Sequence, residues 1–209
     1  LNPKRPDCDY PFDALAGVGV AFKLILALAI KNGLKTTDVF NQYVDIATLG
    51  TIADVVPLLG ENRVIVDKGL KILHNPKRIG IRAIMEVAGV LDKPLNTSTI
   101  AFSIAPRLNA AGRLGSAATA VELLLTNDES RARELALLLD TENKERQQTE
   151  RQIFDEALEL IAKDSNFEKK KVIVLAQENW HQGVIGIVAS RLCDMYYKPC
   201  ILISHTNGV

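Results

Sequence analysis

The chain has 209 residues, of which 47% are hydrophobic and 24% are charged, and its 25 basic and 25 acidic side chains leave no net charge. This composition is typical of a globular protein with a substantial core, and it excludes an intrinsically disordered chain. A neutral chain has no overall field that attracts a polyanion, so any nucleic-acid binding must depend on local patches. The three cysteines, Cys8, Cys193 and Cys200, lack the spacing of metal ligands and indicate a reducing, cytoplasmic compartment.

The most apolar stretch, Leu15 to Ile30, is interrupted by Lys23 and is too short to span a bilayer. It predicts a buried helix that ends at Asn32-Gly33. No signal peptide is recognisable. The chain starts at Leu and ends on the turn-like residues 206–209, so we expect that both ends are cut from a longer sequence.

The first 125 residues are predicted to be mostly helical, with breaks where proline and glycine cluster. The opening residues 2–7 are predicted to form a loop. The expected helices are Ala16 to Lys31, Thr37 to Ala53, Arg63 to Leu73, Ile81 to Ala88, Ser98 to Ala105 and Ser116 to Leu125.

One long helix is predicted from Asn127 to Lys163, because Thr126 and Glu129 have capping-box spacing and no glycine or proline follows. Residues 140–152 contain no hydrophobic side chain, so this part of the helix is expected to cross solvent between two domains. The alternative, a coiled coil, requires heptad apolar positions that are absent.

The last part changes to a strand, helix and strand. Residues 171–176 predict a buried strand, Gly183 to Met195 a helix, and residues 200–204 a second strand. At this spacing the three elements form a parallel βαβ unit. The predicted fold class is therefore α/β and predominantly helical, with domains at 1–125 and 165–209 joined by a connector helix at 126–164.

Residues 106–115 (PRLNAAGRLG) combine two arginines with small neighbours. Arg107 and Arg113 carry planar, permanent charges that match phosphate oxygens, and the small residues between them allow close approach to the backbone. The segment predicts either a phosphate-binding surface or a tight helix crossing with two solvated arginines. The residues alone leave both open.

Two further segments carry candidate chemistry. Asp45 and Asp54 lie in an apolar run, where a carboxylate needs a partner, a hydrogen bond or a metal ion; the residues alone favour a structural role. Trp180, His181 and Gly183 occur at the turn into a helix, where anions are favoured and a base could stack on the indole. An ordinary cap or surface position is the simpler interpretation there.

Taken together and in order, residues 2–8, 15–22, 45–54, 106–115 and 180–191 closely resemble the bacterial RecJ family, the single-strand-specific 5′ to 3′ DNA exonucleases of the DHH phosphoesterase superfamily. The resemblance covers nearly the whole chain. It implies the C-terminal part of a DHH domain, a long connector helix and the start of a DHHA1 domain. It also implies two-metal hydrolysis with Mn²⁺ or Mg²⁺.

The resemblance also implies roles for single residues. Asp45 matches the acidic residue of the family's fourth motif, which helps to hold the catalytic metal, and Asp54 matches the second acidic position of that segment. The matches to DNA- or phosphate-binding positions are Arg107, Asn109, Arg113, Trp180, His181 and Gly183. Single-stranded DNA is the implied partner, with single-strand-binding protein and a RecQ-type helicase as candidate protein partners and no membrane.

The family's first three metal motifs would precede this stretch and its later glycine-rich motifs would follow it. We therefore expect the chain by itself to be inactive, although the parent protein is a nuclease acting in DNA repair and recombination. Two alternatives stay open. One is another DHH phosphodiesterase, acting on oligonucleotides or cyclic dinucleotides, and the other is a non-catalytic DNA-binding scaffold with a RecJ-like fold.

Overall fold

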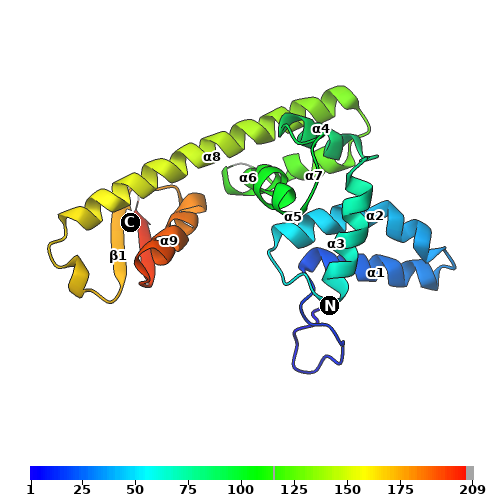
Figure 1. Ribbon diagram of the computed structural model, residues 1–209, viewed down its shortest axis with the longest axis horizontal. Helices are drawn as coiled ribbons and strands as arrows, with labels where there is room; N and C mark the ends of the chain where they lie inside the picture. Colours follow the sequence, from blue (N-terminus) through cyan, green and yellow to red (C-terminus); the bar gives the residue numbers. More distant parts are fainter. Residues whose placement is uncertain (115, 206–209) are drawn as a thin grey trace. The chain divides into compact units, whose positions relative to one another are not determined.

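The computed structural model describes residues 1–114 and 116–205 and divides into two compact units (Figure 1). The first unit comprises residues 1–109 and 118–140, and the second comprises residues 110–117 and those from Thr141 onward. Gly115, the last residue of the arginine-containing segment, and the turn expected at 206–209 lie outside the described residues.

The first unit is built on three helices, α1 (Gly17–Lys31), α2 (Thr36–Ala53) and α3 (Gly60–Leu73), with α2 packed against both of the others. Apolar side chains at helical spacing meet between them and form one core. The buried members of that core are Leu15, Phe22, Val44, Ala47 and Ile65. The predicted end of the first helix is confirmed, because Asn32 is its C-cap and Gly33 takes a φ of +69°.

The remaining helices of this unit agree with the prediction except around Pro106. The helices α4 (Ile79–Val87) and α7 (Ala118–Leu125) occur where expected. However, one helical run continues through the proline, in the order α5 (Thr97–Thr99), η1 (Ile100–Ile104) and α6 (Ala105–Leu114). The element η1 is a π-helical turn in which the N–H of Ala105 donates to the carbonyl of Ile100. The wider turn accommodates a proline that would clash in a regular α-helix.

The predicted long helix is confirmed as α8 (Glu129–Lys163), which has 35 residues and no break. Its N-cap is Asp128 rather than Thr126, since the Asp128 carboxylate accepts a 3.0 Å hydrogen bond from the N–H of Arg131. The middle that was expected to be solvated is partly buried: Asp140 is 6% exposed and Asn143 is 2% exposed. The exposed residues of this stretch are Thr141, Lys144, Glu145, Gln148, Arg151 and Gln152. The two buried side chains, Asp140 and Asn143, both have polar partners.

Those partners are arginines. Arg107 pairs with Asp140, and Glu150 pairs with both Arg146 and Arg191, at 2.7 and 3.0 Å. Such pairs satisfy charged groups without any apolar side chain, so a pattern based on hydrophobicity does not detect them.

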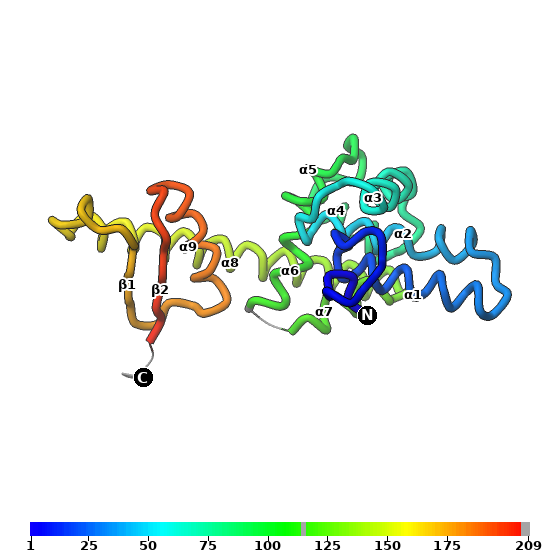
Figure 2. Tube along the Cα trace, turned by 90° about the horizontal axis from the view of Figure 1, so that it is seen from below, coloured from blue at the N-terminus to red at the C-terminus, as the bar shows by residue number. Residues whose placement is uncertain are grey.

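The second unit confirms the predicted βαβ arrangement, with β1 (Ile173–Glu178), α9 (Gln182–Tyr196) and β2 (Cys200–His205). The strands are parallel and lie side by side, with Ile173 opposite Cys200 (Figure 2). A short 3₁₀ turn, η2 (Phe167–Lys169), follows α8. The core of this unit comprises Ile153, Ala157, Ile161, Phe167, Ile173, Trp180, Val184, Val188 and Leu192.

The fold is therefore α/β and predominantly helical, as predicted.

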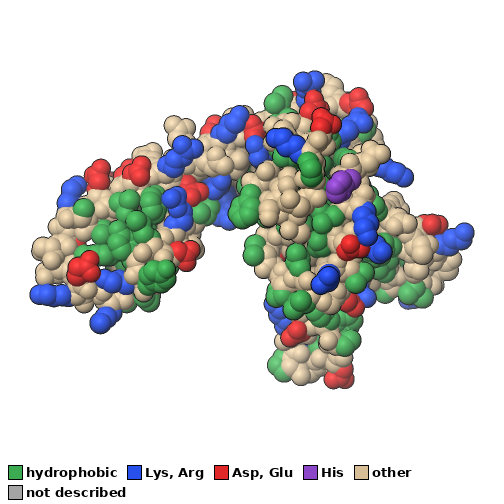
Figure 3. All heavy atoms as spheres, viewed as in Figure 1, with side chains coloured by type: hydrophobic (Ala, Val, Ile, Leu, Met, Phe, Trp, Pro, Cys, Tyr) green, Lys and Arg blue, Asp and Glu red, His purple; other side chains and the backbone are tan. Residues whose placement is uncertain are grey.

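The strands of the second unit leave apolar side chains exposed. Val174, Ile201 and Ile203 remain 44% to 55% exposed, and Figure 3 shows hydrophobic side chains gathered over the β1 and α9 region. Within the described ranges, no helix has both the length and the apolar character needed to cross a membrane.

Candidate functional site

A hollow of about 360 Å³ lies on the first unit, where α2 ends and α1 begins. Asp54 is the C-cap of α2, and its backbone N–H donates to the carbonyl of Gly50 at 3.0 Å. The side chains of Asp54 and Asn109 are exposed, and among the described residues no hydrogen bond or ion pair engages the Asp54 carboxylate. The hollow is lined by Ala16, Gly17, Val18, Gly50, Ala53, Asp54 and Asn109.

Two helix ends of opposite polarity meet at this hollow. The N-cap of α1, Ala16, offers no side-chain hydrogen bond, so the first amides of α1 lack an acceptor within the helix. A helix N-terminus favours an anion, whereas a helix C-terminus, here the end of α2 that bears Asp54, favours a cation. The arrangement suits a divalent cation at Asp54 with a phosphate against α1.

Glycines permit this close approach of the two helices. A Cβ on Gly50 would lie 2.8 Å from Cγ1 of Val18, so any side chain there would push the start of α1 away from α2. A Cβ on Gly17 would meet nothing within 4 Å, so the backbone at the start of α1 is open on that side.

Asp45, the first-choice metal ligand from the sequence, lies in a different environment. Its side chain is 7% exposed and forms a 2.9 Å ion pair with Nε of Arg78. Its second oxygen accepts from the N–H of Ile46 at 2.8 Å, while Arg78 also donates to the carbonyl of Gln42 at 2.6 Å. Asp45 is thus a buried carboxylate that is paired with an arginine. This pairing fits the structural role that the residues alone favour.

The structure does not bring Asp45 and Asp54 together. The two residues are nine positions apart, which corresponds to about two and a half turns of an α-helix and about 13 Å along its axis. The two carboxylates therefore occupy opposite faces of α2, and they line different hollows. Among the described residues, no group of three or more His, Cys, Asp or Glu side chains could hold a metal ion.

Arg107 is also engaged within the protein. Its Nε donates to Oδ1 of Asp140 at 2.8 Å, and its Nη1 donates to the carbonyl of Ser103. The Arg107 and Asp140 side chains are 17% and 9% exposed. Arg107 is thus largely engaged within the protein, and its contact with DNA phosphates stays a prediction, whereas Asn109, one half-turn further on, is exposed in the hollow.

In the second unit, Trp180 is part of the core, and its predicted role in binding the DNA strand stays a prediction. It is 4% exposed, and its Nε1 donates to Oε2 of Glu156 at 2.7 Å. His181 is the N-cap of α9, and its Nδ1 accepts from the N–H of Gly183 at 3.1 Å. Arg113 is exposed and uses one guanidinium nitrogen to reach the carbonyl of Gly183 at 3.1 Å.

Gly183 has a packing role. A Cβ at this position would lie 2.5 Å from the carbonyl oxygen of Arg113, so the glycine allows the chain at Arg113 to approach the start of α9. Sequence reasoning missed Arg78 and Asp140 as the partners of predicted site residues. The sequence indicates only that a buried charge requires a partner. It does not indicate which residue that partner is, because both partners are 33 residues away.

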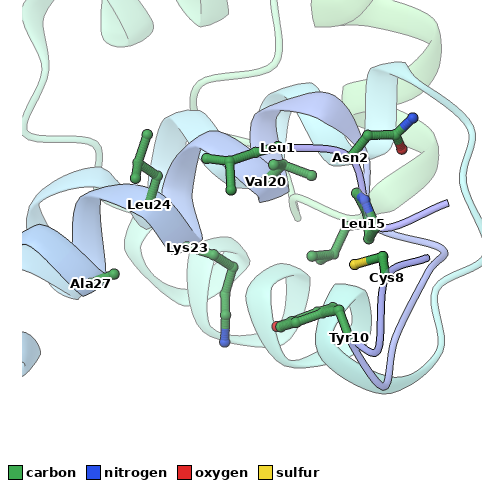
Figure 4. Close-up of a pocket in the computed structure, with 10 residues that line it drawn as sticks. Leu1, Asn2, Cys8, Tyr10, Leu15, Val20, Lys23, Leu24 and Ala27 are labelled. Carbon is green, nitrogen blue, oxygen red and sulfur yellow. The ribbon is translucent and has the colours of Figure 1, made fainter. Parts of the chain in front are cut away.

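Figure 4 shows another hollow of the first unit, of about 310 Å³, which is apolar apart from Lys23 and Asn2 near its edge. Tyr10 lines it and donates from its hydroxyl to both oxygens of Glu61, at 2.8 and 2.9 Å. Burial and this carboxylate raise the pKa of the Tyr10 hydroxyl above its usual value. The hollow is lined by no carboxylate and is a poor candidate for a metal centre.

These features define a two-unit α/β protein with a carboxylate-bearing hollow suited to a cation and a phosphate. No family model matches the chain. Proteins named single-stranded-DNA-specific exonuclease RecJ are similar to it. The protein from Bacillus subtilis is 42% identical over 203 residues, which are 97% of this chain and 25% of that protein. The protein from Haemophilus influenzae is 44% identical over 216 residues, which are 99% of this chain and 38% of that protein.

Solved structures agree. RecJ of Thermus thermophilus in complex with Mn²⁺ superposes with a TM-score of 0.81 at 38% identity, covering 95% of this chain and 28% of that one. Its complex with Mg²⁺ gives a TM-score of 0.82. The chain therefore belongs to the RecJ family. It spans 25% to 38% of the length of these curated relatives.

Proposed function

We propose that this stretch is part of a single-strand-specific 5′ to 3′ DNA exonuclease that hydrolyses phosphodiester bonds with Mn²⁺ or Mg²⁺. The observation that carries the proposal is the unpaired Asp54 carboxylate at the C-terminus of α2, in one hollow with the open N-terminus of α1. The identity of 38% to 44% to RecJ proteins supports it, as do RecJ structures that contain Mn²⁺ or Mg²⁺.

The geometry favours Asp54, rather than Asp45, as the metal ligand. A divalent oxygen-preferring cation needs carboxylate oxygens that are not already engaged, and no described residue pairs with the exposed Asp54 side chain. Asp45 already shares its charge with Arg78. When bound, the cations supply an activated water and stabilise the negative charge that develops on the phosphate.

The other residues then bind and orient the strand. The amides at the start of α1 and the side chain of Asn109 are placed to hydrogen-bond phosphate oxygens at the hollow. Arg113 and His181, both exposed, are candidates for the sugar-phosphate backbone. The family's first three metal motifs, which would precede this stretch, are expected to supply the remaining ligands. The chain alone is therefore expected to be inactive.

The wider setting follows from the same proposal. Unit 1 corresponds to part of a DHH domain, α8 to the connector, and the βαβ unit to the start of a DHHA1 domain. A cytoplasmic role in DNA repair and recombination fits a chain with three free thiols. Single-strand-binding protein and a RecQ-type helicase stay predicted partners.

The test uses the complete protein that contains this stretch, with Mn²⁺ and labelled single strands of several lengths, duplexes and a cyclic dinucleotide. Release of mononucleotides from the 5′ end of single strands only, lost in Asp54→Asn, is the expected result. Cleavage restricted to short oligonucleotides or cyclic dinucleotides would indicate another phosphodiesterase. Binding without cleavage would indicate a scaffold.

A further inference from the structure

Asn62 is a fully buried polar residue. It belongs to none of the sequence motifs and does not line the hollow that contains Asp54. It lies in the first turn of α3 and is 0% exposed. Its amide nitrogen donates two hydrogen bonds, to the carbonyl of Ala14 at 2.7 Å and to the carbonyl of Pro57 at 3.0 Å. Both donors of the amide are thus used by backbone outside α3.

The two carbonyls belong to the two segments that form the hollow. Ala14 precedes Ala16 and Gly17, which line the hollow at the start of α1, and Pro57 follows Asp54 in the loop after α2. In the part of the chain that the structure describes, no backbone hydrogen bond joins residues 13–17 to residues 54–59. The Asn62 side chain is the polar link between these walls.

The loop after Asp54 needs such a link. Val55 adopts a φ of +55°, which is unfavourable for a β-branched residue and persists only where the surroundings hold it. Val55 is 84% exposed, so its own side chain provides little of that restraint. The hydrogen bond from Asn62 to Pro57 fixes the loop two residues further on.

The amide oxygen of Asn62 is buried and has no hydrogen-bond partner among the residues that the structure describes. A buried acceptor without a partner is unfavourable. The contribution of Asn62 therefore comes from the two hydrogen bonds that its amide nitrogen donates. An aspartate of nearly the same shape would place a carboxylate oxygen against two carbonyl oxygens.

We infer that Asn62 is a positioning residue of the Asp54 site: its amide fixes the distance between the Asp54 loop and the first turn of α1. The inference rests on the proposed function, because it assigns Asn62 to the spacing that a cation and a phosphate require. Residues that orient ligands in this way typically change metal affinity by about 10- to 100-fold when replaced.

The test compares the complete protein with Asn62→Leu, Asn62→Asp and a matched control, Thr48→Val. Thr48 is equally buried and donates from Oγ1 to the carbonyl of Ile65 at 3.0 Å, but it does not touch the hollow. Mn²⁺ affinity is measured by titration at a temperature at which circular dichroism shows each variant to be folded. Hydrogen exchange is measured over residues 53–61.

We expect both Asn62 variants to bind Mn²⁺ at least about 10-fold more weakly, with faster exchange in residues 53–61. Thr48→Val should melt at a lower temperature with Mn²⁺ affinity within about twofold of the original. If Asn62→Asp does not fold, because its carboxylate is buried against two carbonyl oxygens, the neutral Asn62→Leu of similar size decides. Unchanged Mn²⁺ affinity in a folded Asn62 variant overturns the inference, whereas a parent protein that binds no Mn²⁺ overturns the proposed function instead.

Discussion

Replacing Arg107 by glutamine should destabilise the first unit rather than weaken DNA binding directly. The substitution removes the 2.8 Å ion pair to Asp140 and the hydrogen bond to the carbonyl of Ser103. Both side chains of the pair are more than four-fifths buried, so the Asp140 carboxylate would lose one cationic partner in a poorly solvated place. Breaking one partner of such a pair costs about 3 kcal/mol.

The first unit has about 130 residues, so this cost corresponds to a fall in melting temperature of about 10 °C. Thermal unfolding followed by circular dichroism measures it, with Arg113→Gln, an exposed position, as the control. The double variant Arg107→Gln, Asp140→Asn should be more stable than the sum of the single effects, by about 1 kcal/mol or more.

An Arg107→Gln protein that melts like the original and binds single-stranded DNA with a flatter dependence on salt would refute this prediction. Such a result would mean that Arg107 contacts phosphate, as the sequence pattern alone allows.

Three further outcomes are expected. Gly50→Ala should lower stability by about 1 to 3 kcal/mol and weaken Mn²⁺ binding, because a Cβ there collides with Val18; denaturant titration and metal titration together check this. Burial and the neighbouring Cys193 raise the pKa of the Cys200 thiol to about 11. Its alkylation at pH 8 should therefore be about 100-fold slower than that of an ordinary cysteine, and the alkylation rate should increase with pH until the pH reaches this pKa. Arg113→Gln in the complete protein should reduce the slope of log affinity for single-stranded DNA against log salt by about 0.7, uniformly across sequences; an unchanged slope would remove this phosphate contact.

The elements that the sequence predicts well have a single regular pattern. The helix at 17–31 follows from helical spacing and its Asn32-Gly33 end, and the β1–α9–β2 unit follows from β-branched runs on either side of an amphipathic segment. The unbroken length of α8 follows from the absence of glycine and proline.

The parts that could not be predicted depend on partners distant in sequence. The burial of Asp140 requires Arg107, and that of Asp45 requires Arg78, 33 residues away in each case. Helical continuity through Pro106 depends on one π turn that no local rule signals. Trp180 packs in the core and donates to Glu156. From the sequence alone, a tryptophan on which a base stacks cannot be distinguished from one that is part of the core.

The same limit applies to the site. Asp45 and Asp54 are both carboxylates in an apolar run, and only the structure shows that one is paired while the other opens into a hollow. The motif pattern points to the helix that carries both carboxylates, but not to the one that is available.

The most direct test of this account is the Mn²⁺ dissociation constant of the complete protein in two variants, Asp54→Asn and Asp45→Asn. We expect Asp54→Asn to weaken Mn²⁺ binding by at least about 10-fold while the metal-free melting temperature stays within about 2 °C of the original. Asp45→Asn should lower the melting temperature, because it leaves Arg78 without its carboxylate, and should keep the Mn²⁺ affinity. The opposite pattern, with metal binding lost in Asp45→Asn and retained in Asp54→Asn, would contradict the assignment of the site.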